Sequence, residues 1–81
     1  MKNFLKNKII LITGGTGSFG QKFLYKILKT KFKQVRILSR DEKKQEDLRN
    51  KINNNKIKFY IGDVRDKQSI SEAFKNVDYI F

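Results

Sequence analysis

Residues 8–20 read Lys-Ile-Ile-Leu-Ile-Thr-Gly-Gly-Thr-Gly-Ser-Phe-Gly, a short apolar run that ends at a cluster of glycines. A continuous apolar run of this length is typical of a parallel strand that is buried on both faces. From residue 18 to residue 30, apolar side chains recur at the spacing of one helix face. They are Phe19, Phe23, Leu24, Ile27 and Leu28. The sequence therefore predicts a strand that leads into a helix through a glycine-rich turn.

The same alternation continues along the rest of the sequence. Residues 34–39 and 56–61 have the pattern of further strands, and residues 79–81 start a fourth. Asp41 and Asp66 are placed to begin the two intervening helices, because a carboxylate accepts the free amides of a helix start. Alternating strands and helices without a proline predict an α/β fold, a Rossmann-type parallel sheet in three layers with the order β-α-β-α-β-α-β.

The predicted sheet has the size of half a dinucleotide-binding domain, because such domains are built from two halves of this kind. We therefore expect residues 1–81 to be the N-terminal NAD(P)-binding half-domain of a larger protein, ending before its catalytic region. A chain of this length buries only ~60% of the surface that its unfolded form exposes. Its stability is accordingly expected to be marginal.

Composition excludes several classes of function. The sequence has no Cys and no His, so it lacks thiolate nucleophiles, imidazole bases and the usual zinc ligands, and we expect no metal site. Its apolar runs are much shorter than the ~18 residues of a membrane span. The N-terminus also lacks the pattern of a secretory leader. We expect a cytoplasmic protein without a membrane partner.

The chain is strongly basic, with 19 Lys and Arg against 8 Asp and Glu and a net charge of +11. Such a balance raises the alternative of a small basic module that binds nucleotides or nucleic acid without catalysis. However, 15 of the 19 basic residues are Lys, and they are scattered through nearly every segment. We favour a solvated basic surface over a nucleic-acid site.

The glycine-rich turn predicts a phosphate-binding site. Gly14 permits a tight turn after the strand, Gly17 lets a pyrophosphate approach the backbone, and Gly20 lets the helix pack closely on the sheet. The amides expected to face the phosphates belong to Thr16, Gly17, Ser18 and Phe19. The positive end of the helix dipole adds to their attraction for an anion.

The end of the second predicted strand bears on the choice of cofactor. A carboxylate there bonds the ribose hydroxyls of NAD, whereas Arg accommodates the 2′-phosphate of NADP. Ser39, Arg40 and Lys43 provide a hydroxyl and two cations, which favours NADP. Asp41 keeps NAD open as the alternative, although we favour the interpretation of this residue as a helix cap. After the third strand, Asp63 and Val64 are candidates to hold the adenine ring.

Three stretches together carry a resemblance to a known family: residues 13–20, the Ser-Arg-Asp-Glu-Lys of residues 39–43, and the Phe-Tyr-Ile-Gly-Asp-Val-Arg-Asp of residues 59–66. Along its whole length the chain resembles the polysaccharide-biosynthesis branch of the extended short-chain dehydrogenase/reductases. That branch contains UDP-N-acetylglucosamine 4,6-dehydratases and capsular nucleotide-sugar 4-epimerases. The resemblance favours a dehydratase slightly and leaves the UDP-glucose type of epimerase open.

The resemblance implies a tightly held NADP that oxidises C4 of a nucleotide sugar and later returns the hydride. It also implies that the catalytic Tyr-x-x-x-Lys pair lies beyond residue 81, so that this chain alone is inactive and contacts its nucleotide-sugar substrate only through the remaining part. Tyr25 and Lys29 have the same spacing, but they lie on the first helix and we interpret them as coincidence. Homo-oligomers are possible for a full-length parent, and a truncated product without function is a further alternative.

Overall fold

The computed structural model describes residues 4–81, in which strands and helices alternate from the first strand onward. The strands are β1 (Ile9–Thr13), β2 (Gln34–Ser39), β3 (Ile57–Ile61) and β4 (Tyr79–Ile80), and the helices are α1 (Ser18–Leu28), α2 (Glu42–Ile52) and α3 (Lys67–Phe74). The bounds of the strands and of the first two helices agree with the sequence prediction to within two residues, whereas the third helix, expected to carry Val77 as well, ends at Phe74. The first helix ends slightly early, at a turn in which the amide and hydroxyl of Thr30 both donate to the carbonyl of Ile27.

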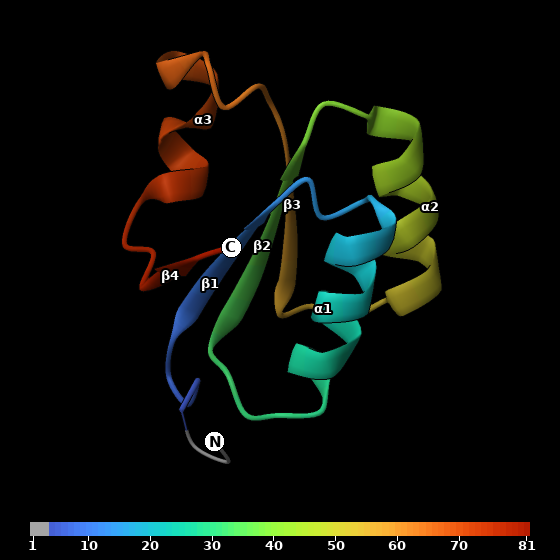
Figure 1. Cartoon of the computed structure of the whole chain (residues 1–81), viewed down its shortest axis with the longest axis vertical. Helices are drawn as coiled ribbons and strands as arrows, with labels where there is room; N and C mark the ends of the chain where they lie inside the picture. Colours follow the sequence, from blue (N-terminus) through green and yellow to red (C-terminus); the bar gives the residue numbers. More distant parts are fainter. Residues whose placement is uncertain (1–3) are drawn as a thin grey trace.

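The four strands form one parallel sheet in the order β3-β2-β1-β4. Ile10 of β1 pairs with Val35 of β2 on one side and with Tyr79 of β4 on the other. Helices α1 and α2 cover one face of the sheet, and α3 covers the opposite face (Figure 1). The predicted α/β fold, a three-layer Rossmann-type sheet in the order β-α-β-α-β-α-β, is confirmed.

The two central strands supply both halves of the hydrophobic core. The cluster beneath α1 and α2 includes Ile10, Ile12, Leu24, Ile27, Val35, Ile37 and Leu48. The cluster beneath α3 includes Leu11, Leu38, Ile70 and Ala73. Because successive strand residues point to opposite faces, a strand covered on both sides favours apolar residues at successive positions. Residues 9–12 of β1 and residues 37 and 38 of β2 follow this pattern, whereas Arg36 of β2 is buried and polar.

The second and third helices begin at the predicted capping residues. Oδ1 of Asp41 accepts a hydrogen bond from the Lys44 amide at 3.0 Å, and Oδ1 of Asp66 accepts one from the Gln68 amide at 3.2 Å. Each carboxylate satisfies an amide that has no partner inside the helix. The carboxylate of Asp41 is therefore engaged locally, as expected for a cap.

A buried arginine caps the C-terminal end of α3, the helix on the second face of the sheet. Arg36 of β2 is 9% exposed, and its Nη1 atom donates to the carbonyl oxygens of Glu72, Ala73 and Lys75 at 3.2, 3.0 and 2.6 Å. The last carbonyls of a helix lack intrahelical partners and carry the negative end of its dipole. A strand cation thus fixes the C-terminal end of α3 against the sheet.

Five aromatic rings form a row along the β4 side of the sheet. The ring centroids of Phe4 and Tyr79 are 5.1 Å apart, and those of Phe23 and Phe81 are 4.6 Å apart. Phe19 stacks on Phe23 at 6.4 Å and is itself 82% exposed. The described chain therefore carries exposed apolar surface beside its shortest strand, a kind of surface that favours association.

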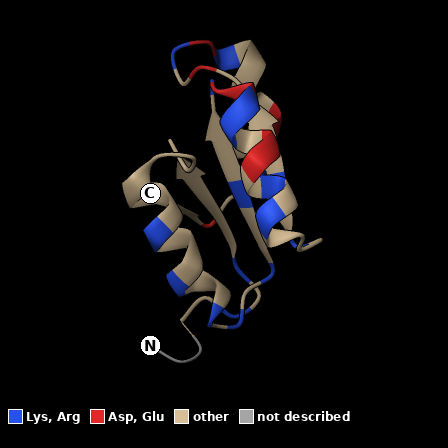
Figure 2. Cartoon of the chain, turned by 90° about the vertical axis from the view of Figure 1, so that its right-hand side faces the viewer, with Lys and Arg blue, Asp and Glu red and all other residues tan. Residues whose placement is uncertain are grey.

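Basic residues are distributed over several elements. Figure 2 shows Lys and Arg along α1 and α2 and in the loops at the amino ends of the strands, with acidic residues interrupting them along α2. Within residues 4–81, no helix has the length and apolar character to cross a membrane. The same part of the chain contains no group of His, Cys, Asp and Glu residues that could hold a metal ion.

Candidate dinucleotide site

The glycine-rich turn joins β1 to α1 at the carboxyl edge of the sheet. Gly14 has a φ of +66°, a conformation that other residues rarely adopt. Its amide donates to the carbonyl of Leu38 at 2.8 Å, and its carbonyl accepts from the amide of Gly17 at 3.0 Å. The turn is therefore anchored to β2 and closed on itself before α1 begins.

Two further glycines are required by close packing inside the chain. A Cβ atom on Gly20 would lie 2.6 Å from Cα of Gly15 and 2.7 Å from the carbonyl oxygen of Gly14. A Cβ atom on Gly15 would lie 2.7 Å from Cγ2 of Ile37 in β2. Gly20 thus lets α1 rest directly on the turn. Gly15 was not predicted to have a role, although its place in a pair of adjacent glycines was a signal for it.

Gly17 has no such steric requirement within the described residues. A Cβ atom there would make only an ordinary contact, 3.5 Å from the carbonyl oxygen of Gly14, and its φ is −77°. Gly17 is the N-cap of α1 and gives the helix no side-chain hydrogen bond. The absence of a side chain at this position therefore leaves the start of the helix open from outside.

The first turn of α1 offers free hydrogen-bond donors. Within residues 4–81, the backbone amides of Ser18 and Phe19 have no hydrogen-bond acceptor. The Gly17 amide differs from the other predicted donors because it already donates to Gly14. Thr16 is buried, and its carbonyl accepts from the Gln21 side chain at 2.8 Å. The free amides and the positive end of the helix dipole together suit an anionic ligand.

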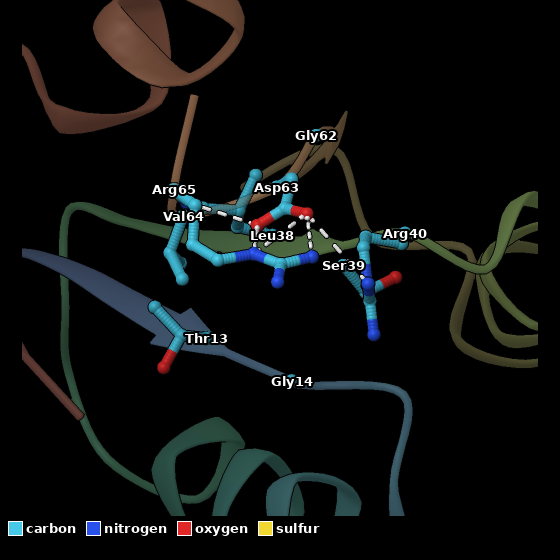
Figure 3. Close-up of a pocket in the computed structure, with 9 residues that line it drawn as sticks. All are labelled: Thr13, Gly14, Leu38, Ser39, Arg40, Gly62, Asp63, Val64 and Arg65. Atoms are coloured by element: carbon cyan, nitrogen blue, oxygen red, sulfur yellow. Dashed lines mark hydrogen bonds and ion pairs between the residues drawn. The ribbon is translucent and has the colours of Figure 1, made fainter. Parts of the chain in front are cut away.

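A cavity of about 440 Å³ opens at the carboxyl ends of β1, β2 and β3. It is lined by Thr13, Gly14, Leu38, Ser39, Arg40, Gly62, Asp63, Val64 and Arg65 (Figure 3). Parallel α/β sheets bind their ligands outside this edge. The fold therefore brings the predicted residues Gly14, Ser39, Arg40, Asp63 and Val64 to one cavity, although they come from three loops.

The cavity wall carries two cations and one carboxylate. Nη2 of Arg65 donates to Oδ2 of Asp63 at 2.7 Å, and the Arg65 amide donates to Oδ1 at 2.9 Å. Nη1 of Arg40 lies 3.6 Å from the same Oδ2 atom (Figure 3). The hydrogen bonds from Arg65, and then the positive charges of Arg65 and Arg40, hold the pKa of Asp63 well below its usual range. Asp63 in turn raises the pKa of Arg65.

Arg40 also borders a second, wider hollow that leads toward the glycine-rich turn. This hollow has a volume of about 600 Å³ and is lined by Thr16, Ser39, Arg40, Asp41 and Glu42. The side chain of Arg40 is 71% exposed. A guanidinium in this position is reachable both from the cavity and from the start of α1.

Lys43 lies apart from both hollows. Its Nζ atom is 3.2 Å from Oδ1 of Asp47 one helical turn later, and its side chain is 81% exposed. The next residue, Lys44, instead lines a third hollow together with Thr16, Gly17 and Ser18. Lys43 therefore stays a prediction for the phosphate site, and Lys44, which was not predicted, lies closer to the glycine-rich turn because of how α2 is rotated against the sheet.

Ser39 is held from behind by a buried glutamine. The Oγ atom of Ser39 accepts a hydrogen bond from Nε2 of Gln45 at 2.9 Å, and the same nitrogen donates to the carbonyl of Tyr60 at 2.7 Å. Gln45 is 1% exposed. Gln45 was not predicted as a site residue, although it lies three residues before Leu48 and seven before Ile52, the spacing of one helix face.

Tyr25 and Lys29 lie at the far end of α1 from the glycine-rich turn. Tyr25 is 37% exposed, and Lys29 is the C-cap residue of the helix. The helix begins at the turn and runs away from the cavity edge (Figure 1). This arrangement agrees with the interpretation of their Tyr-x-x-x-Lys spacing as coincidence.

Residues 10–81 match the model of a family described as polysaccharide biosynthesis protein. The chain belongs to this family. Curated relatives include proteins named UDP-glucose 4-epimerase from Rickettsia bellii (strain OSU 85-389) and Rickettsia prowazekii (strain Madrid E), which are 60% and 57% identical to the chain over 93% of its length. The chain spans 23% of the length of each of these relatives.

Solved structures share the fold of the chain. The X-ray structure of Pen from Bacillus thuringiensis superposes with a TM-score of 0.90 at 40% identity, over 96% of this chain and 24% of that chain. A putative short chain dehydrogenase from Escherichia coli CFT073 shares the fold with a TM-score of 0.72 at 21% identity, over 99% of this chain and 40% of that chain. The predicted resemblance to the polysaccharide-biosynthesis branch of the extended short-chain dehydrogenase/reductases is confirmed.

Proposed function

We propose that this chain is the NADP-binding part of an enzyme that modifies a nucleotide sugar for surface or capsular polysaccharide. The observation that carries the proposal is the position of two kinds of anion-binding group on one edge of the sheet. The free amides of Ser18 and Phe19 suit a pyrophosphate, and the guanidinium of Arg40 suits a 2′-phosphate. Family membership and the names of the relatives support a nicotinamide dinucleotide as the ligand.

The residues present fit such a cofactor. Gly17 leaves the start of α1 open, because no side chain stands before the amides of Ser18 and Phe19. The cavity at the strand ends would take the adenosine, with Asp63 accepting from the adenine amino group. Val64 is 55% exposed and provides an apolar contact for the ring.

The proposal favours NADP over NAD because of the groups that remain available at the end of β2. NAD binding usually relies on a carboxylate that bonds the ribose hydroxyls. The carboxylate that follows β2 in the sequence, Asp41, already caps α2. Ser39 and Arg40 remain, a hydroxyl and a cation that fit a phosphate. Lys43 would join them only by leaving its ion pair with Asp47.

The names of the relatives support a proposal for the substrate and reaction of the whole enzyme. When bound, the nicotinamide would accept a hydride from the sugar and return it. Because the relatives are named UDP-glucose 4-epimerase, we favour a 4-epimerase acting on a UDP-sugar over a 4,6-dehydratase. The residues of this chain bind and orient the cofactor, and we expect the 81-residue chain alone to have no epimerase activity.

Thermal unfolding of the 81-residue chain with NADP, with NAD and without ligand tests the proposal, because a ligand that binds only the folded state raises its stability. We expect NADP to raise the unfolding temperature more than NAD. The comparison is repeated with single-stranded RNA at low and high salt. Stabilisation by RNA alone, lost at high salt, would favour the nucleic-acid alternative, since binding to a phosphate backbone weakens steeply with ionic strength.

A further inference from the structure

The orientation of the Gln45 amide is fixed by the backbone of β3. One side-chain atom of Gln45 lies 2.7 Å from the carbonyl oxygen of Tyr60 and 2.9 Å from Oγ of Ser39. A carbonyl oxygen only accepts hydrogen bonds, so the atom facing it must be the amide nitrogen. Turning the amide over would place two oxygens against each other. Gln45 therefore donates to Ser39 and cannot accept from it through this atom.

Because Gln45 donates to the Ser39 hydroxyl, the hydrogen of that hydroxyl stays available for a ligand. A serine hydroxyl has one hydrogen and two lone pairs, and one lone pair of the Ser39 hydroxyl accepts the hydrogen bond from Gln45. Among residues 4–81 the Ser39 hydroxyl has no acceptor for its own hydrogen, including Oε1 of Gln45, which has no partner. Ser39 lines the cavity between the strand ends (Figure 3). Its hydroxyl is therefore free to donate into that cavity.

We propose that Gln45 is a positioning residue that makes Ser39 a hydrogen-bond donor toward the ligand, and that it thereby favours a 2′-phosphate over a 2′-hydroxyl. The inference rests on the proposed dinucleotide function and deepens it. A phosphate has only acceptor oxygens, so it pairs with a donor hydroxyl and with the guanidinium of Arg40 at once. A ribose hydroxyl gains less, because its bond to Ser39 is not assisted by charge.

A purely structural role explains Gln45 less well. An amide that only tied α2 to the sheet would leave its buried Oε1 atom without a partner, and a buried unpaired acceptor destabilises a fold. An apolar side chain of similar size would fill the same space without that penalty. The donor function toward Ser39 gives a reason for a polar group at a position that is 1% exposed.

The test compares the dissociation constants of NADP and NAD for the 81-residue chain and its variants. Gln45→Met keeps the volume and removes the donor, Ser39→Ala removes the hydroxyl, and the double variant Ser39→Ala/Gln45→Met removes both. We expect Gln45→Met and Ser39→Ala each to weaken NADP binding about tenfold and NAD binding less than about threefold. The double variant should lose no more than Ser39→Ala alone, because Gln45 acts through Ser39.

Leu48→Ala is the matched control. Leu48 is buried one turn further along α2 and belongs to the apolar cluster, so its truncation lowers stability without touching Ser39. We expect the ratio of NADP to NAD affinity to stay unchanged in this variant. A ratio that falls equally in Leu48→Ala and Gln45→Met would overturn the positioning role.

The remaining outcomes separate this inference from the proposed function. If the unchanged chain binds NAD as tightly as NADP, the NADP assignment fails and this inference fails with it. If the chain prefers NADP but Gln45→Met retains that preference, the inference is wrong and the proposed function stands. If Gln45→Met does not fold, Ser39→Ala decides, because a preference that survives loss of the hydroxyl contradicts the inference.

Discussion

Nη1 of Arg40, just beyond β2, lies 3.6 Å from Oδ2 of Asp63, just beyond β3. Arg65 holds the same oxygen more closely, at 2.7 Å. The Arg40 side chain is 71% exposed, and exposed ion pairs typically contribute only ~0–1 kcal/mol. Arg40 can therefore leave Asp63 for a phosphate at small cost, while Arg65 continues to neutralise the carboxylate.

Replacing Arg40 tests its assignment to the 2′-phosphate. We expect Arg40→Gln to weaken NADP binding about 10- to 100-fold, because a charge-assisted hydrogen bond to the phosphate is lost. NAD binding should change less than about threefold. Calorimetric titration measures both, and Lys67→Gln, at the exposed start of α3 outside the cavity, is the matched loss of one positive charge. Equal losses for both cofactors in Arg40→Gln would remove Arg40 from the 2′-phosphate site.

Two glycine substitutions should separate stability from binding. Gly20→Ala places a Cβ atom 2.6 Å from the backbone of Gly15, so we expect it to destabilise the fold by about 1–3 kcal/mol. Gly17→Ala meets no atom closer than 3.5 Å and should destabilise by at most about 1 kcal/mol. Its methyl group should nevertheless weaken binding of NADP and NAD alike, since it stands before the free amides of α1.

Urea denaturation gives the two stabilities, and titration with each cofactor gives the affinities. Gly17→Ala binding both cofactors as tightly as the unchanged chain would show that no ligand approaches the turn at this point.

The ion pair of Asp63 predicts a pH dependence of stability with a defined sign. The pKa of Asp63 is lowered in the folded chain, so its contribution is fully present above the unfolded value of ~4 and is lost as the pH falls through the folded value. We expect the difference in unfolding temperature between the unchanged chain and Asp63→Asn to stay constant from about pH 7 to about pH 5. It should shrink below about pH 4. A difference that begins to shrink near neutral pH would contradict this account of Asp63.

The strands and the helix caps could be predicted because residues that are close in the sequence determine them. Each apolar run and each capping residue lies within or next to the element that it defines, and the structure places β1, β2 and the caps Asp41 and Asp66 as predicted. The cavity residues were also found, because parallel strands end at one edge and the residues following them must meet there.

Side-chain hydrogen bonds between elements that are distant in the sequence could not be predicted in the same way. Gln45 reaches Tyr60, 15 residues away, and Arg36 reaches Ala73, 37 residues away. Each contact depends on how a helix is rotated and seated against the sheet, which apolar spacing defines only roughly for a helix as polar as α2. The rotation of α2 also decides which of its lysines faces the glycine-rich turn. Lys43 was the residue predicted there, whereas Lys44 lines the hollow beside the turn.

Replacing Arg36 tests its hydrogen bonds to the end of α3. Arg36→Met keeps much of the side-chain volume but leaves the carbonyls of Glu72, Ala73 and Lys75 without their donor. We expect a loss of about 1–3 kcal/mol in the free energy of unfolding, with faster amide hydrogen exchange in α3 than in α1. Arg49→Met is the control, because Arg49 is exposed and its guanidinium lies over the ring of Phe59, at 4.9 Å from the centroid, away from α3. Similar losses in the two variants would show that the contact with α3 adds nothing.

Calorimetric titration of the folded 81-residue chain with NADP and NAD, at the same ionic strength, addresses cofactor binding itself. The structure predicts that one NADP binds per chain, at least about tenfold more tightly than NAD, because Arg40 and Ser39 present a cation and a donor hydroxyl to the 2′-phosphate. A folded chain that binds neither cofactor, or that binds NAD as tightly as NADP, would contradict the assignment of this edge of the sheet as an NADP site.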